Sequence, residues 1–170
     1  MIKRGSNGFT LIELLIVIIL IGILSGVLIS VIDPVRIYNR GKYAKAESDM
    51  TKFIGAVEVV RVNTGLQLGR ITNVWCSSCG VCDGDLRESS GTCYTNWIAA
   101  RDAVNTAGQG QVDLNSINRD PWGSPYLLDE SEGDPSEASC VYDTISSAGP
   151  DGISGTSDDI SFTIPFYSCR

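Results

Sequence analysis

The chain has 170 residues, of which 43% are apolar, 18 are Gly, 6 are Cys and none is His, and its formal net charge is −7. The missing imidazole excludes serine–histidine and cysteine–histidine catalysis and most catalytic zinc sites. The acidic balance argues against specific or general nucleic-acid binding, because that affinity rests on basic side chains that neutralise phosphates.

An apolar segment follows a short polar leader. Residues 9–32 hold 18 apolar residues in 24 positions and contain no Lys, Arg or Pro. A helix of that length extends about 36 Å, which is enough to cross a bilayer. A secretory signal has its small-residue cleavage site after the apolar run, whereas here Gly8 stands before it. Glu13 stands near the start of the run, and an unpaired carboxylate in a membrane is costly, so Glu13 needs a partner.

The stretch Gly8-Phe9-Thr10-Leu11-Ile12-Glu13-Leu14 resembles the processing motif of type IV pilins and of the pseudopilins of type II secretion systems. The resemblance implies that a prepilin peptidase cuts between Gly8 and Phe9 and methylates the new amine. It also implies that Glu13 pairs with the Phe9 amine of an adjacent subunit during assembly. An ordinary membrane anchor explains the length of the apolar segment but not this spacing of Gly, Phe and Glu.

The next segment is predicted to be an amphipathic helix over residues 34–65. Asp33-Pro34 is expected to kink or break the helical stem before it, because Pro removes a backbone donor. Apolar residues then recur at spacings of four, three, four and three, on one helical face: Ala46, Met50, Phe53, Val57 and Val60. The other face is predicted to be solvated and charged: Arg36, Arg40, Lys42, Lys45, Glu47, Asp49, Lys52 and Glu58. Asn63-Thr64-Gly65 supplies a stop.

Residues 66–170 are predicted to form a small, acidic head. Between residues 71 and 170 there are four Arg against 15 Asp or Glu, a balance of −11. Residues 66–92 show no sustained period and are expected to be a loop, followed by a short helix over 97–107 with Asn96 as its cap and Gly108 as its stop. Three later runs are predicted strands, with Pro165 at a strand edge or end: 126–128, 140–146 and 160–166.

These elements predict an α+β fold, in which a long N-terminal helix packs on a small C-terminal antiparallel sheet. The resemblance implies the same pilin-like arrangement. It divides the chain into a removed leader, a membrane and filament-core helix, the amphipathic half of the stem and an extracytoplasmic head: 1–8, 9–33, 34–65 and 66–170.

All six cysteines follow the apolar segment: Cys76, Cys79, Cys82, Cys93, Cys140 and Cys169. An even count in an exported head favours disulfides, although sequence alone does not choose among the pairings. The alternative is a thiolate metal or iron–sulfur site on Cys76-x-x-Cys79-x-x-Cys82, with a fourth ligand from one of the later cysteines.

An acidic, Gly-rich loop lies near the C-terminus, at residues 149–159. Calcium takes oxygens from carboxylates and backbone carbonyls, and a sharply bent loop of this composition could supply them. Together with Asp120-Pro121-Trp122-Gly123, the loop resembles the head of the major pseudopilins of type II secretion, whose C-terminal loop binds calcium. The resemblance implies Asp151 and Asp158 as ligands of a structural Ca²⁺, with Asp159 as a substitute. The alternative is a solvated turn. Trp122 is predicted to be a turn aromatic packed on the head.

The sequence therefore predicts a non-enzymatic structural subunit of a helical homo-oligomeric filament. The resemblance implies a prepilin peptidase and an inner-membrane assembly platform as partners, a single pass through the cytoplasmic membrane before assembly, and an extracellular or periplasmic filament afterwards. The alternative is a membrane-tethered extracytoplasmic binding module that does not polymerise. An enzyme comes third, because no spacing of Asp, Glu or Cys specifies a reaction. A retractile pilus and a secretion pseudopilus both stay open, and the head motifs favour the secretion type.

Overall fold

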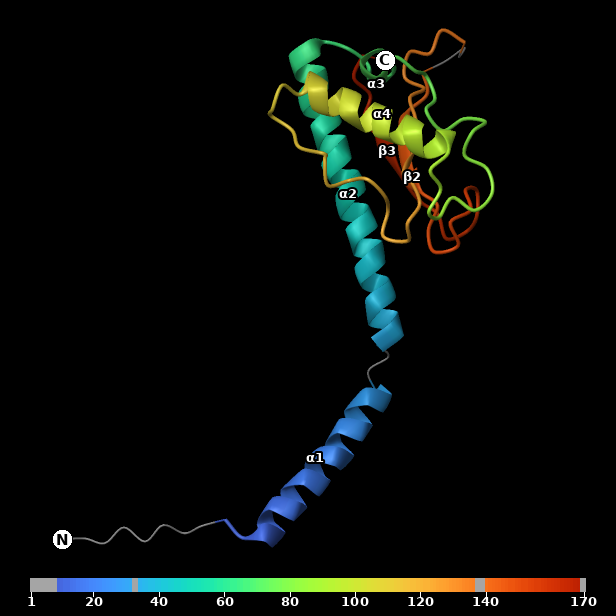
Figure 1. Cartoon of the computed structure of the whole chain (residues 1–170). Helices are drawn as coiled ribbons and strands as arrows, with labels where there is room; N and C mark the ends of the chain where they lie inside the picture. Colours follow the sequence, from blue (N-terminus) through green and yellow to red (C-terminus); the bar gives the residue numbers. More distant parts are fainter. Residues whose placement is uncertain (1–8, 32–33, 137–139, 169–170) are drawn as a thin grey trace, which may run out of the picture. The chain divides into compact units, whose positions relative to one another are not determined.

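The computed structural model describes residues 9–31, 34–136 and 140–168 of the chain (Figure 1). The chain divides into two units, Met1–Arg40 and Gly41–Arg170, and the division falls inside a helix. The elements are α1 (Leu11–Val31), α2 (Pro34–Thr64), α3 (Leu68–Thr72), α4 (Thr92–Ala107), β1 (Leu127–Asp129), β2 (Asp143–Ser147) and β3 (Ile160–Ile164). Helices followed by a small antiparallel sheet make the α+β fold that the sequence predicts.

The break predicted at Asp33-Pro34 falls partly outside the described residues, since residues 32 and 33 are not among them. The described part of α1 ends at Val31, and α2 begins at Pro34. Proline suits the first position of a helix, because its missing N–H would have no partner there. Gly65, with φ of 70°, follows α2 and donates its backbone N–H to the carbonyl of Arg61 at 2.8 Å, which confirms the predicted stop.

The apolar face of α2 is the centre of the head's core. All five residues of the predicted face are fully buried: Ala46, Met50, Phe53, Val57 and Val60. Phe53 packs on Trp97 of α4, and Trp97 packs on Tyr126 beside β1, each with ring centroids 5.3 Å apart. These contacts place α2, α4 and the start of the sheet around one core.

Asp49 does not lie on the solvated face of α2, so that part of the prediction is wrong. Its side chain is buried. It accepts a hydrogen bond from the hydroxyl of Tyr126 at 3.1 Å and pairs with Lys45 one turn earlier. The phenol of a buried tyrosine needs a polar partner, and a carboxylate on the adjoining helix provides one.

Two helical predictions in the head need correction. The segment 66–92 is not all loop, because it contains the short helix α3. Helix α4 begins at Thr92, earlier than expected, and Asn96 lies inside it instead of capping it. The Cys82–Cys93 disulfide holds the first turn of α4, and Asn96 donates its side-chain amide to the carbonyl of Ser77 at 2.9 Å. Tertiary contacts therefore extend a turn whose own residues are weak helix formers.

The sheet has the order β1-β2-β3, with both pairs antiparallel. Leu128 lies opposite Ile145, and Ile145 lies opposite Phe162. Leu128 and Ile145 are buried in the core with Ile164 at the end of β3. β3 stops before Pro165, as predicted for a residue that cannot donate to a ladder.

Candidate functional site

Helix α1 is apolar around its whole circumference and uncovered. Every side chain from Leu11 to Leu28 is exposed, and this stretch is long and apolar enough to cross a membrane. A helix that is apolar on all faces needs a covering of lipid or of other chains, because such a surface is unfavourable in water.

The one carboxylate in this stretch belongs to the start of the helix. Thr10 and Glu13 form a capping box, in which the Thr10 backbone N–H donates to Glu13 Oε2 at 2.8 Å. The Glu13 N–H lies 3.4 Å from Thr10 Oγ1, and that hydroxyl also donates to Glu13 Oε2, at 2.6 Å. The spacing Thr-x-x-Glu is a sequence signal for such a cap. The sequence reasoning missed it.

The assembly and processing residues are therefore only partly placed. Phe9 precedes the cap and is 80% exposed, and Gly8 lies outside the described residues. Both bonds from Thr10 reach Oε2 of Glu13.

The cysteine-rich segment after α3 lies against the edge of the sheet. The structure pairs Cys76 with Cys79 and Cys82 with Cys93. Cys140 is also disulfide-bonded, and Cys169 lies outside the described residues. These pairings leave no thiolate set for the metal or iron–sulfur site considered on the first three cysteines.

The acidic loop is the connection between β2 and β3. Gly149 begins it with φ of 65°, and a Cβ there would lie 2.4 Å from the carbonyl oxygen of Asp158, so the loop closes on itself only with glycine at this position. The Asp151 N–H donates to Asp158 Oδ2 at 3.1 Å, and the Asp151 carboxylate accepts the Ile153 N–H at 2.8 Å. Bonds from Thr156 and Asp151 lower the pKa of Asp158.

Asp159 is turned to a different partner. Its Oδ2 accepts the Gly155 N–H at 2.7 Å, within its own turn. The structure thus joins the backbone of Asp151 to the carboxylate of Asp158, while the carboxylate of Asp159 caps the turn. The carboxylates of this loop and its bent backbone are oxygen donors of the kind that Ca²⁺ prefers.

The acidic loop is joined to the cysteine-rich segment by a backbone hydrogen bond and by the side chain of Arg87. The Leu86 N–H donates to the Gly152 carbonyl at 2.8 Å. Arg87 pairs with Asp85 at 2.6 Å and reaches the Pro150 carbonyl at 3.4 Å. The Arg87 guanidinium holds the pKa of Asp85 at about 2. One cation therefore lies beside the acidic loop within the chain itself.

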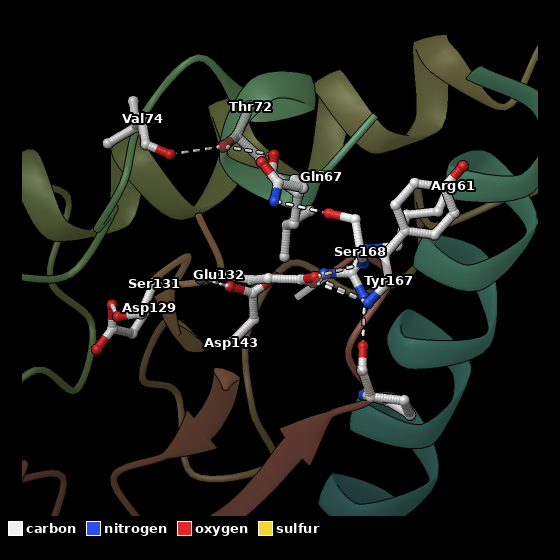
Figure 2. A network of polar contacts seen from close by, with 12 residues as sticks. Arg61, Gln67, Thr72, Val74, Asp129, Ser131, Glu132, Asp143, Tyr167 and Ser168 are labelled. Carbon is white, nitrogen blue, oxygen red and sulfur yellow. Dashed lines mark hydrogen bonds and ion pairs between the residues drawn. The ribbon is translucent and has the colours of Figure 1, made fainter. Parts of the chain in front are cut away.

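A buried polar network fastens the C-terminal segment to α2 (Figure 2). Arg61 is 2% exposed and pairs with Asp143 and, at 3.1 Å, with Glu132. It also donates to the Pro165 carbonyl at 2.6 Å. Glu132 Oε1 accepts the backbone N–H groups of Tyr167 at 2.9 Å and Ser168 at 2.7 Å. Sequence reasoning did not single out Arg61, because a charged residue near a helix end usually faces water.

Two carboxyl groups in this region keep their protons more tightly than usual. Burial raises the pKa of Asp143 to about 6, against the opposing effects of the Glu132 N–H and the Arg61 guanidinium. Burial raises the pKa of Glu130 to about 7, against the opposing effect of its hydrogen bonds from Ser77. Both side chains are fully buried in the head.

The DPWG stretch also has a structural role. Asp120 is buried, and its Oδ1 accepts the backbone N–H groups of Trp122 at 3.0 Å and Ser124 at 2.9 Å. Its Oδ2 accepts the hydroxyl of Ser147 at 2.5 Å, which ties the turn to β2. Trp122 packs edge-on against Tyr43 of α2, with centroids 5.0 Å apart, as expected for a turn aromatic.

Comparison with known proteins finds similarity both to the N-terminal helix and to the chain as a whole. Residues 3–29 match the family described as the prokaryotic N-terminal methylation motif. The chain is 29% identical over 155 residues to the type II secretion system core protein G of Escherichia coli strain K12, which covers 91% of this chain and 89% of that protein. It is 27% identical over 160 residues to the protein of the same name from Aeromonas hydrophila, covering 93% and 92% respectively.

No solved structure matches the chain at a significant level. The family match covers the apolar helix and its capping box, and the two relatives extend the similarity through the head. The chain therefore carries an N-terminal methylation motif and is similar, over most of its length, to the type II secretion system core protein G of two bacteria.

Proposed function

We propose that this chain is a structural subunit of a type II secretion pseudopilus, which polymerises through its N-terminal helix. The observation that carries the proposal is α1 itself, a fully exposed apolar helix with one carboxylate at its start. Lipid covers such a helix in the membrane, and neighbouring copies of the same helix cover it in a filament. Moving between these two apolar surroundings requires no exposure of α1 to water.

The proposal gives Glu13 the task of setting the axial register. After cleavage behind Gly8, Phe9 carries a free amine, and a buried amine and a buried carboxylate are each costly alone. Both Thr10 bonds reach Glu13 Oε2, so we assign the other oxygen, Oε1, to the Phe9 amine of the next subunit. Because the contact joins two different surfaces of the same chain, it repeats without closing and produces a fibre.

The proposed partners follow from this route of assembly. A prepilin peptidase removes the leader, and an inner-membrane platform adds subunits from the cytoplasmic membrane to a periplasmic or extracellular filament. The role is structural and involves no catalytic step. The homology to core protein G favours a secretion pseudopilus over a retractile pilus.

We further propose that the acidic loop binds one structural Ca²⁺ through Asp151 and Asp158. The bond from the Asp151 backbone N–H to Asp158 Oδ2 supports the proposal, because it holds these two residues beside each other in the bent loop. Bound calcium would hold the β2–β3 connection in its bent form. Asp159 would then act through the Gly155 N–H rather than as a ligand.

A membrane-tethered binding module is the competing function. Electron microscopy of material sheared from cells that express this chain with its secretion machinery separates the two. The proposal predicts thin filaments labelled by an antibody against the head. Abundant, processed chain that stays dispersed in the membrane, with no labelled filament, would refute polymerisation and support the binding module.

A further inference from the structure

The Cys76–Cys79 disulfide is held on the edge of the sheet, apart from the buried disulfide. Cys76 forms a β-bridge with Asp129, the last residue of β1. The Ser78 N–H donates to the Leu128 carbonyl at 3.1 Å, and the Glu130 N–H donates to the Trp75 carbonyl at 3.1 Å. The segment from Trp75 to Ser78, here called the edge strap, thus continues the sheet beside β1.

Three ligand-type groups meet at this strap. The Sγ atoms of Cys76 and Cys79 and a carboxylate oxygen of Asp129 all lie within 4.8 Å of one another, and within the described ranges they are the one such group of three. In a tetrahedral zinc site with Zn–S bonds of about 2.3 Å and Zn–O bonds of about 2.1 Å, neighbouring ligand atoms stand about 3.5 to 3.8 Å apart. The two sulfurs are joined in the disulfide, so they must separate on reduction before both can reach one ion beside Asp129.

The groups around these atoms already support ligand roles. The Cys79 N–H points at Cys76 Sγ, at 3.1 Å, and such a bond stabilises a thiolate. The hydroxyl of Ser131 donates to Asp129 Oδ1 at 2.8 Å, which fixes the carboxylate and leaves its other oxygen for an ion. Hydrogen bonds of this kind orient the ligands of metal sites.

The two fully described disulfides differ in access. Cys79 is exposed and Cys76 is half-buried, whereas Cys82 is 8% and Cys93 is 3% exposed. A reductant from solvent therefore reaches the Cys76–Cys79 bond first. Thiol–disulfide exchange requires direct approach of a thiolate to one sulfur, so burial protects the Cys82–Cys93 bond.

We propose that Cys76, Cys79 and Asp129, beside the edge strap, form a redox-gated site for a thiophilic divalent cation such as Zn²⁺. A dithiol reductant attacks Cys79 Sγ, and Cys76 leaves as a thiolate. The second thiol of the reductant then displaces Cys79, so two electrons pass to the protein and the reductant becomes a disulfide. The cation binds both thiolates and the Asp129 carboxylate, any remaining thiol protons go to solvent, and water fills the fourth position.

The strap keeps its place without the disulfide, so the reduced ligands stay together. Ser77 is buried and donates its N–H and hydroxyl to the two oxygens of Glu130, at 2.7 and 2.5 Å. The Ser77 carbonyl accepts the amide of Asn96 from α4. None of these bonds involves a cysteine, and they tie the strap to both the sheet and a helix.

Titration with Co²⁺ tests the proposal, because thiolate ligation of Co²⁺ gives a charge-transfer band and intense visible absorption. The full chain in detergent is reduced with a dithiol, freed of reductant without oxygen, and titrated. The expected result is one tightly bound Co²⁺ per chain with thiolate bands, displaced by Zn²⁺, and no such bands in the oxidised chain. Asp129→Asn should weaken Co²⁺ binding about tenfold or more while keeping the thiolate bands.

The matched control is the double variant Cys76→Ala with Cys79→Ala, which retains Asp129 and the other cysteines. Thiolate bands that persist in this variant would place the ion elsewhere and overturn the site. An absence of bands in the reduced wild-type chain, with two free thiols verified, would overturn it as well. An affinity unchanged by Asp129→Asn would remove the carboxylate from the site and overturn the three-ligand form proposed.

Discussion

The guanidinium of Arg61, near the end of α2, is buried against the carboxylate of Asp143, the first residue of β2. This pair joins the stem helix to the sheet at one point, and Glu132 extends it to the backbone of Tyr167 and Ser168 (Figure 2). The backbone of the head's last described residues, Tyr167 and Ser168, is thus held by hydrogen bonds to Glu132. The stability of the head should depend strongly on this one arginine.

Replacing Arg61 with Met should destabilise the head by about 3–5 kcal/mol, because two carboxylates would stay buried without their cation. Urea unfolding of the full chain in detergent, followed by tryptophan fluorescence, measures the loss. All three Trp residues lie in the head, at positions 75, 97 and 122. The control Lys52→Met removes an exposed charge from the same helix and should change the unfolding free energy by no more than about 0.5 kcal/mol. Equal small effects of both variants would contradict the structural role of Arg61.

The stability of the head should fall as pH rises from about 4.5 to about 7. The pKa of Glu130 is raised from 4.5 to about 7 in the folded head, so the folded state binds this proton more tightly than the unfolded state. The stabilising effect of protonation is fully present below the pKa of the unfolded state. It is lost as pH rises through the pKa of the folded state, and the total change in unfolding free energy is up to about 3 kcal/mol. Asp143, with its pKa raised to about 6, adds a change of the same sign.

Unfolding free energies at several pH values in that range test this expectation. Glu130→Gln keeps an oxygen for the Ser77 donors and removes the titrating group, so it should flatten the slope between pH 5 and 7. A variant with the wild-type slope would show that Glu130 does not cause the pH dependence, whatever its effect on absolute stability.

The parts of the fold that show a regular spacing of apolar residues in the sequence could be predicted. The parts that depend on a single partner far away in the sequence could not. The four-three spacing located the buried face of α2, since any core helix must keep one side apolar. The same pattern placed Asp49 in water and gave no role to Arg61, because the burial of a charge depends on partners 77 and 82 residues away. The start of α4 was missed for a similar reason, since a disulfide fixes it.

The candidate sites show the same division. Glu13 and the Gly-Phe junction could be identified from local spacing, and the Thr10-x-x-Glu13 cap could have been. The pairing of Cys76 with Cys79 depends on how the chain folds back on β1. In the C-terminal loop, the Asp159 carboxylate accepts the Gly155 N–H, and this partner depends on the turn at Gly155.

Calcium should raise the melting temperature of the head, and a chelator should lower it. Binding to the folded chain alone stabilises it by about 2.7 kcal/mol at 100 times the dissociation constant. Asp158→Asn should remove this response, because it takes away one of the two carboxylates proposed to bind calcium. Asp83→Asn, an exposed acidic residue outside the loop, is the matched control and should respond as the wild type does. A melting temperature indifferent to millimolar calcium in the wild-type chain would refute the calcium site.

The yield of sheared filaments from cells carrying Glu13→Ala tests most directly the claim that this carboxylate joins neighbouring subunits. The chain should enter the membrane and lose its leader at wild-type levels, but filament yield should fall at least tenfold, because a buried amine would lose a partner that contributes more than about 1.4 kcal/mol. Glu47→Ala, which removes an exposed carboxylate of α2, should assemble normally. Wild-type filament yield from Glu13→Ala, with processing at Phe9 verified by mass spectrometry, would contradict the proposed mode of assembly.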